Sequence, residues 1–177
     1  GKKAKLHLKI DTGMGRIGFS PEQAPAEAER IARLDGIEIE GIFTHFAVAD
    51  ESSENADRYT ERQYRTFCET CERIERERHI HIPLRHAANS AAILRFPHMH
   101  LDLVRAGIIL YGLWPSGDLK ACGADLRPAM TLKSAISHVK SVGPGSSLSY
   151  GRTYCTQEPA VIATIPAGYA DGYFRGL

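Results

Sequence analysis

Four polar clusters in this sequence combine residue types that bind anions and move protons. Arginine offers a planar fork of donors that fits phosphate and carboxylate groups, and backbone N–H groups at a helix start also bind phosphate. Histidine exchanges protons near neutral pH. We therefore expect a phosphate-bearing cofactor held by main-chain donors, Ser90 and a glycine, with Arg16, Arg105 and His45 around its ring. The clusters are Asp11-Thr12-Gly13 with Arg16, Thr44-His45 with Asp50, His86 with Asn89-Ser90, and Arg105 with Gly107.

Each cluster follows a segment whose apolar pattern predicts a β-strand. The predicted strands cover 5–10, 37–43, 80–87 and 101–110, and the predicted helices cover 20–36, about 55–78 and 90–95. A capping box in Ser20-Pro21-Glu22-Gln23 is expected to open the first helix. Alternating strands and helices predict an α/β fold with a parallel sheet, either open or part of a barrel. Because the carboxyl ends of parallel strands meet at one edge, the clusters are expected to form one site.

Each cluster also has a purely structural explanation. Asp11-Thr12-Gly13 is typical of a capping turn, and Asn89-Ser90 is typical of a helix N-cap. A single histidine such as His45 is more often a hydrogen-bonded core residue than a catalytic one. The coincidence of polar clusters at every predicted strand exit favours a site over these separate explanations.

Lys9 lies in the middle of the first predicted strand. Because side chains alternate along a strand, it shares a face with His7 and Asp11, opposite Leu8 and Ile10. If the apolar face packs on helices, Lys9 points into the barrel. A buried lysine has to be paired, neutralised or chemically modified.

The composition favours a small-molecule partner. Lys and Arg total 22 against 21 for Asp and Glu, so no overall charge attracts nucleic acid or an anionic membrane. No N-terminal stretch resembles a signal peptide or a membrane span, and the 4 cysteines form no dense framework, which predicts a cytoplasmic protein. Cys68 and Cys71 are compatible with a redox pair or half of a metal site, but their place in a helical pattern favours helix core, and no metal site is expected.

The hydrophobic pattern and the composition of the sequence change after residue 123. Runs at 129–142 and 160–166 are typical of strands, and the residues between them are rich in Gly, Ser and Pro. We predict a first domain at 1–123, the C-terminal half of a (β/α)8 barrel, and at 124–177 the start of a mainly β domain. A complete barrel of this kind needs about 250 residues. We therefore expect the chain to be an internal fragment of a longer protein.

Motifs along the whole chain closely resemble, in order, those of alanine racemases. Any one of them is weak by itself, whereas the ordered set is specific. The resemblance implies a pyridoxal 5'-phosphate (PLP) enzyme of fold type III, with a (β/α)8 barrel, a β C-terminal domain and a homodimer that shares its active sites. The motifs are KIDTGMGRIG (9–18), THFA (44–47), HAANS (86–90), RAGIILYG (105–112), LSYG (148–151) and GYADGY (168–173).

The resemblance also assigns roles to individual residues. Arg16 would bind the phenolic oxygen of the cofactor and lie near the substrate carboxylate, and Arg105 would face the pyridine nitrogen. A permanent cation there keeps the nitrogen unprotonated, so the ring withdraws electrons less strongly. The remaining cofactor contacts would be His45 behind the ring, Asn89 supporting the pocket, and Ser90, Gly107 and Ile108 at the phosphate.

Racemisation needs an acid/base group on each face of the substrate α-carbon. Tyr150 matches the family tyrosine that acts on L-alanine from the neighbouring subunit, and Tyr169 matches a tyrosine at the substrate entrance. The other group, the lysine that holds PLP, belongs upstream of Gly1, so the chain alone is expected to be inactive. Lys9 matches a different family lysine, often carbamylated, that orients the arginine corresponding to Arg16.

The resemblance implies an isomerase that supplies D-alanine for peptidoglycan. One alternative is a racemase for serine or for several amino acids, since the carboxylate contacts are shared. Another is a non-catalytic, PLP-binding barrel relative. Tyr150 and the β domain argue against the latter, because a binding protein needs no second acid/base group.

Overall fold

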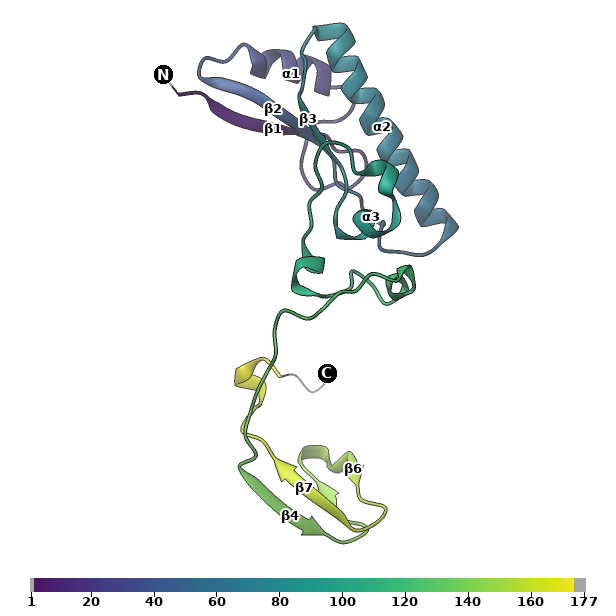
Figure 1. The fold of residues 1–177 in the computed structure, drawn as a ribbon, viewed down its shortest axis with the longest axis vertical. Helices are drawn as coiled ribbons and strands as arrows, with labels where there is room; N and C mark the ends of the chain where they lie inside the picture. Colours follow the sequence, from purple (N-terminus) through teal and green to yellow (C-terminus); the bar gives the residue numbers. More distant parts are fainter. Residues whose placement is uncertain (1, 174–177) are drawn as a thin grey trace. The chain divides into compact units, whose positions relative to one another are not determined.

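The structure is a computed structural model that describes residues 2–173, and it divides into two compact units. Unit 1 is Gly1–Ala129 and unit 2 is Met130–Leu177. Unit 1 contains a parallel sheet with helices, and unit 2 contains short antiparallel ladders (Figure 1). Within the described residues, no helix is both long and apolar enough to cross a membrane.

The sheet of unit 1 has three parallel strands in the order β1 (Ala4–Lys9), β2 (Ile37–Phe43) and β3 (Leu84–His86). In its register, Lys9 pairs with Phe43 and Phe43 pairs with His86. Side chains in register across a sheet point to the same face. Lys9, Phe43 and His86 therefore form one row on one face, and their neighbours along each strand point to the other.

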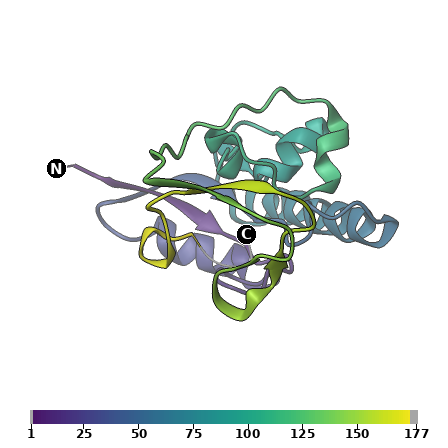
Figure 2. The ribbon, with the colours of Figure 1, turned by 90° about the horizontal axis from the view of Figure 1, so that it is seen from below.

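Three α-helices connect and follow these strands. They are α1 (Ala24–Ala32), α2 (Glu54–Arg78) and α3 (Ser90–Arg95), and α1 and α2 lie against each other in unit 1 (Figures 1 and 2). Ser53 caps α2 by accepting the N–H of Ala56, and His79 ends it in the left-handed conformation. Short 3-10 helices cover Pro97–Met99, Ile108–Tyr111 and Asp118–Cys122.

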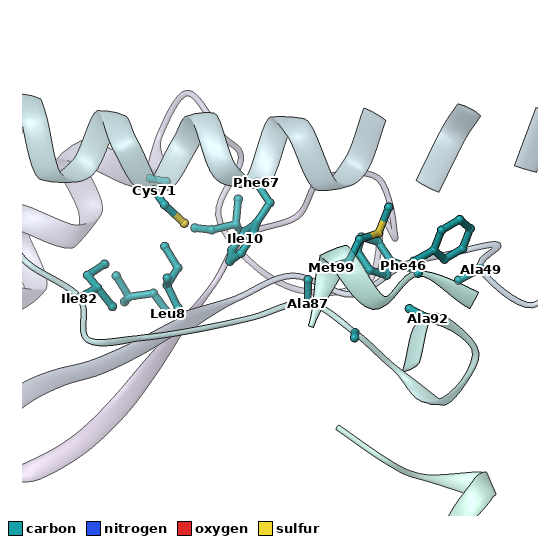
Figure 3. Close-up of a cluster of buried hydrophobic side chains, with 14 of the residues drawn as sticks. Leu8, Ile10, Phe46, Ala49, Phe67, Cys71, Ile82, Ala87, Ala92 and Met99 are labelled. Carbon is teal, nitrogen blue, oxygen red and sulfur yellow. The ribbon is translucent and has the colours of Figure 1, made fainter. Parts of the chain in front are cut away.

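The apolar face of the sheet packs against α2. Leu8 and Ile10 point to this face, toward Phe67 and Cys71 of the helix (Figure 3), and Ile42 belongs to the same buried cluster. Phe67 is fully buried, and burying a side chain of this size contributes roughly 1.5–3 kcal/mol. Cys71 is buried in the same cluster, and burial raises the pKa of its thiol to about 12. The helix-core interpretation of the Cys68/Cys71 pair is confirmed.

Several predicted boundaries are wrong. The predicted strand at 101–110 is irregular chain that ends in the 3-10 helix Ile108–Tyr111. Asp102 meets the edge of β3: its carboxylate accepts the N–H of Arg85, and its own N–H donates to the Arg85 carbonyl. β3 begins only at Leu84, directly after Pro83, which cannot donate to a ladder.

The first helix also begins later than predicted. Ser20 and Gln23 form the reciprocal side-chain contacts of the expected capping box, at 3.3 and 3.4 Å. Residues 21–23 nevertheless make a turn, and α1 starts at Ala24 with Pro25 in its first turn. Proline is suited to that place because its missing N–H would have no partner there.

Unit 2 contains two antiparallel pairs of strands (Figure 1). β4 (His138–Val142) pairs with β7 (Ala160–Thr164), and β5 (Ser147–Leu148) pairs with β6 (Tyr154–Cys155). Two 3-10 helices, Tyr150–Arg152 and Tyr169–Asp171, complete the described part of the unit. β7 matches most of the run predicted at 160–166, whereas β4 covers only the end of the run predicted at 129–142.

Candidate active site

The guanidinium of Arg105 is held by groups at the exits of β2 and β3. Nη1 donates to Nδ1 of His86 over 2.6 Å. Nη2 lies 2.8 Å from the carbonyl oxygen of Thr44, 3.0 Å from that of Ala87 and 3.2 Å from Nδ1 of His45. The two N–H groups of Nη2 are shared among these three acceptors, of which Nδ1 of His45 is the farthest. Arg105 is thereby fixed in both position and orientation.

These contacts determine the protonation of two histidines. Arginine has only donors, so Nδ1 of His86 and Nδ1 of His45 must accept. Burial and then the charge of Arg105 lower the pKa of His86 to about 4. The same two causes, in the same order, lower the pKa of His45. Both rings are neutral at neutral pH and carry their hydrogen on Nε2.

Lys9 lies at the other end of the row that contains Phe43 and His86. The ring of Phe43 stacks on His86 with centroids 5.0 Å apart, and Nζ of Lys9 lies 5.8 Å from the Phe43 centroid. Nζ donates to the carbonyl oxygen of Ile10 over 2.7 Å. Burial lowers the pKa of Lys9 more than the nearby Asp11 carboxylate raises it. The environment therefore favours the neutral amine relative to an exposed lysine.

Polar groups of a different kind gather at the start of α3. The side-chain oxygen of Asn89 accepts the N–H of Ala92 over 3.0 Å, so the N-cap interpretation of this residue is confirmed. Its amide nitrogen also lies 3.4 Å from the carbonyl oxygen of Phe46, which connects the loop after β2 to α3. Ser90 is buried, and its hydroxyl accepts the N–H of Gly107 over 2.9 Å. The serine hydrogen is left to donate to a ligand.

A cavity of about 360 Å³ connects these two groups of residues. Its volume lies in the range of roughly 300–1,000 Å³ that is usual for small-molecule sites. Asp50 of the second polar cluster also lies on its wall. The predicted cofactor residues that line it are His45, Asn89, Ser90, Arg105, Gly107 and Ile108.

The loop after β1 is built around the Asp11 carboxylate. Its Oδ1 accepts the N–H groups of Gly13 and Gly15 at 3.1 and 3.0 Å, and these bonds, that of Gly15 first, lower the pKa of Asp11. Asp11 therefore closes a turn with its side chain but caps no helix, because α1 begins only at Ala24. Arg16 is exposed and is not part of the cavity wall, but its charge lies close enough to lower the pKa of Lys9 and His45.

Two family profiles match successive parts of the sequence. The profile described as "Alanine racemase, N-terminal domain" matches residues 1–115, and the one described as "Alanine racemase, C-terminal domain" matches residues 129–177. The chain belongs to the alanine racemase family. This assignment confirms the resemblance inferred from the motifs and places the chain in a family of isomerases.

Relatives and solved structures agree with the family assignment. The chain is 52% identical to an alanine racemase of Desulforamulus reducens, covering 100% of this chain and 47% of that protein. The alanine racemase structure from E. faecalis matches with a TM-score of 0.84 and 38% identity, covering 98% of this chain and 45% of that one. The structure from Clostridium difficile 630 matches with a TM-score of 0.78 and 46% identity, over 98% and 45%.

The chain thus spans less than half the length of these alanine racemases. Their fold combines a (β/α)8 barrel with a C-terminal domain, and this chain covers part of each. The predicted fold class, a partial barrel followed by the start of a mainly β domain, is confirmed.

The other two residues matched to alanine racemase motifs lie in unit 2. Tyr150 begins the 3-10 helix Tyr150–Arg152, and its side chain is 80% exposed within the described chain. The residues beside it adopt positive φ angles, 59° at Ser149 and 74° at Gly151. Tyr169 begins the second 3-10 helix, where Asp171 accepts the N–H of Gly168 over 2.9 Å.

The motif comparison missed one residue that organises the site. Gln63 of α2 is fully buried; its oxygen accepts the N–H of Ala47, and its nitrogen lies 3.2 Å from the carbonyl oxygen of His45 and 3.4 Å from Oγ1 of Thr12. It thereby ties the loops after β1 and β2 to the helix. Its signal in the sequence is a polar residue within the apolar stripe of α2, one turn before Phe67.

Proposed function

We propose that the protein containing this chain interconverts L- and D-alanine with PLP as cofactor. The observation that carries the proposal is Arg105, held by two neutral histidines on the wall of a cavity that is also lined by Ser90. Family membership and relatives named alanine racemase support it.

The donors around the cavity fit PLP. A phosphate requires hydrogen-bond donors, which the Ser90 hydroxyl and the backbone N–H of Ile108 would supply; the N–H of Gly107, which donates to Ser90 in this structure, would turn to the phosphate when the cofactor binds. A pyridine nitrogen requires a partner in the ring plane, and the guanidinium of Arg105 would provide it. His45 would pack behind the ring, and Asn89 would hold the phosphate end of the wall in place through its bonds to Phe46 and Ala92.

When bound, PLP withdraws electrons from the substrate α-carbon and so makes its proton removable. Arg105 limits that withdrawal, because a guanidinium donates a hydrogen bond to the ring nitrogen and does not give up its proton. The neutral His86 and His45 keep Arg105 in this role without adding charge.

Arg16 would bind the phenolic oxygen of the cofactor and lie near the substrate carboxylate. Lys9 would hold Arg16 in place as a carbamate: its neutral amine attacks CO2, a nitrogen–carbon bond forms, and one proton is released. The burial that lowers the pKa of Lys9 favours this reaction, since only the unprotonated amine is nucleophilic. The new carboxylate would then pair with the guanidinium of Arg16.

Tyr150 would remove and return the α-proton on the L-alanine side, acting in the active site of the partner subunit of a homodimer. Its phenol needs a nearby cation or donor to ionise near neutral pH, since the ordinary pKa of tyrosine is about 10. The group on the opposite face would be the PLP-binding lysine of the complete protein. Tyr169 would line the substrate entrance.

The biological role proposed is the supply of D-alanine for peptidoglycan in the cytoplasm. The test is the complete protein, purified with PLP, incubated with L-alanine or L-serine, and analysed on a chiral column. Conversion of L-alanine with little conversion of serine supports the proposal. PLP binding without conversion of any amino acid favours a non-catalytic barrel relative, and preference for serine favours a racemase of different specificity.

A further inference from the structure

His7 makes a contact that crosses the whole width of the sheet. It lies on β1, yet its Nδ1 is 2.7 Å from Nε2 of His86 on β3, with β2 between them. The register explains how this is possible, because His7 pairs with Gly41 of β2. A Cβ atom added at Gly41 would lie 2.5 Å from Nδ1 of His7. The absence of a side chain at Gly41 therefore lets the imidazole lie over the middle strand.

The hydrogen bonds from Arg105 through His86 to His7 can run in only one direction. Nδ1 of His86 accepts from Arg105, so the single hydrogen of the neutral ring is on Nε2 and donates to His7. Nδ1 of His7 must then accept, which places the hydrogen of a neutral His7 on Nε2. That atom lies 3.4 Å from Oε2 of Glu40.

Glu40, at the outer end of this chain of hydrogen bonds, is held by an ion pair. Glu40 binds Lys5 through its other oxygen, with Nζ 2.7 Å from Oε1. Lys5 lowers the pKa of Glu40, chiefly through that hydrogen bond, so the carboxylate stays an acceptor. The charged or titratable groups in contact with His7 among the described residues are thus Glu40 on one side and His86 on the other. Neither requires a hydrogen on Nδ1.

We propose that His7 is a positioning residue of the site, which keeps His86 in the tautomer that accepts from Arg105. With the Nε2–H of His86 satisfied by His7, its Nδ1 remains bare and faces the guanidinium. Without His7, Arg105 alone would select this tautomer, and the Nε2–H of His86 would lose its acceptor; that loss raises the population of the form with its hydrogen on Nδ1, facing the donors of Arg105. The inference rests on the proposed function only for its effect on catalysis, because the tautomer is a property of the protein without cofactor.

The test compares two substitutions at His7 in the complete protein. His7→Phe keeps a ring over Gly41 but cannot accept a hydrogen bond, whereas His7→Asn places an amide oxygen close to the position of Nδ1. Nitrogen-15 NMR of histidine-labelled protein without PLP reports which ring nitrogen of His86 carries hydrogen, with His86→Gln used to assign the signal. We expect the Nε2–H form in the wild type and in His7→Asn, and loss of that single form in His7→Phe.

The kinetic comparison follows in the protein loaded with PLP. We expect His7→Phe to lower kcat for alanine about tenfold, the effect of one lost hydrogen bond, and His7→Asn to restore most of it. An unchanged His86 tautomer in His7→Phe overturns the inference, and so does equal damage by both substitutions. A wild type that lacks racemase activity contradicts the proposed function alone, because the NMR comparison still decides the role of His7.

Discussion

The two units of the chain differ in what fixes their functional residues. Unit 1 has an apolar core between its sheet and α2, with Ile10, Ile42 and Phe67 fully buried. In the described part of unit 2, the only buried residue is Thr156, while Met130 is 84% exposed and Val161 70%. Thr156 works through hydrogen bonds, donating to the carbonyl oxygen of Gly143 over 2.7 Å and accepting the N–H of Ser146.

Because the two units are stabilised differently, we expect unit 1 to determine cofactor binding and Tyr150 of unit 2 to determine proton transfer. The proposed cofactor contacts lie at strand exits whose positions the core of unit 1 determines, and Arg105 and Gln63 then lock the loops together. Tyr150 lies in a unit that is organised by short ladders and turns. Substitutions in unit 1 should therefore change stability and cofactor binding, whereas Tyr150 should change the reaction alone.

The largest expected effect is on the reaction, from Tyr150→Phe. Removing a general acid/base group slows proton transfer by roughly 10²–10⁴-fold. We expect this loss for α-proton exchange from L-alanine, measured by deuterium incorporation in the complete protein, and a much smaller one from D-alanine. Tyr154→Phe, an exposed tyrosine of the same unit, is the control and should exchange at the wild-type rate. Equal losses from both enantiomers would refute the one-sided role.

The second prediction concerns stability in the two units. Phe67→Ala should lower the free energy of unfolding by about 3–5 kcal/mol, because it removes buried surface and leaves a cavity. Val161→Ala, at an exposed apolar position of unit 2, should cost less than about 0.5 kcal/mol. Urea denaturation followed by circular dichroism measures both. A cost at Val161 close to that at Phe67 would show that unit 2 has a core of its own in the complete protein.

Hydrophobic periodicity was a good guide where an element is long or satisfies its own hydrogen bonds. The strand predicted at 37–43 matches β2, and α2 begins and ends within about a residue of the predicted helix. It failed at 101–110, where the segment contacts residues 85–88 through the Asp102 carboxylate and isolated main-chain bonds and forms no regular ladder. Those contacts depend on tertiary structure and have no signal in local sequence.

For the candidate site, the residue types at the strand exits predicted which positions lie together. His45, Ser90 and Arg105 all reach one cavity. The sequence did not predict how they are held, since Gln63 comes from a helix far along the chain and acts through backbone groups of the loops. Such contacts follow from packing, and only an unexpected polar residue on an apolar helix face indicates them.

The third prediction tests that packing directly. Gln63→Leu keeps the approximate volume but leaves the buried N–H of Ala47 and the carbonyl oxygen of His45 without their partner. We expect a loss of about 1–3 kcal/mol in the free energy of unfolding, together with weaker PLP binding in a fluorescence titration. Gln157→Leu, at an exposed glutamine of unit 2, is the matched control and should change neither. If Gln63→Leu leaves PLP affinity unchanged, the loops do not depend on this side chain.

The smallest expected effect is a dependence of stability on pH that originates in unit 1. The pKa of His86 is lowered to about 4 in the folded protein, against about 6.5 for an unfolded histidine. Between these values the unfolded chain binds more protons, so stability falls as the pH falls from about 6.5 toward 4. The lowered pKa of His45 acts in the same direction.

One group contributes at most about 1.4 kcal/mol per pH unit in that window. His86→Gln should therefore reduce the difference between the urea midpoints at pH 7 and pH 5, even though it also lowers both of them. His138→Gln removes an exposed histidine of unit 2 and should keep the wild-type difference. If both variants show the same difference between the urea midpoints at pH 7 and pH 5, the charge balance around Arg105 does not control the acid stability of unit 1. The contrast between the units would then rest on the apolar core of unit 1 alone.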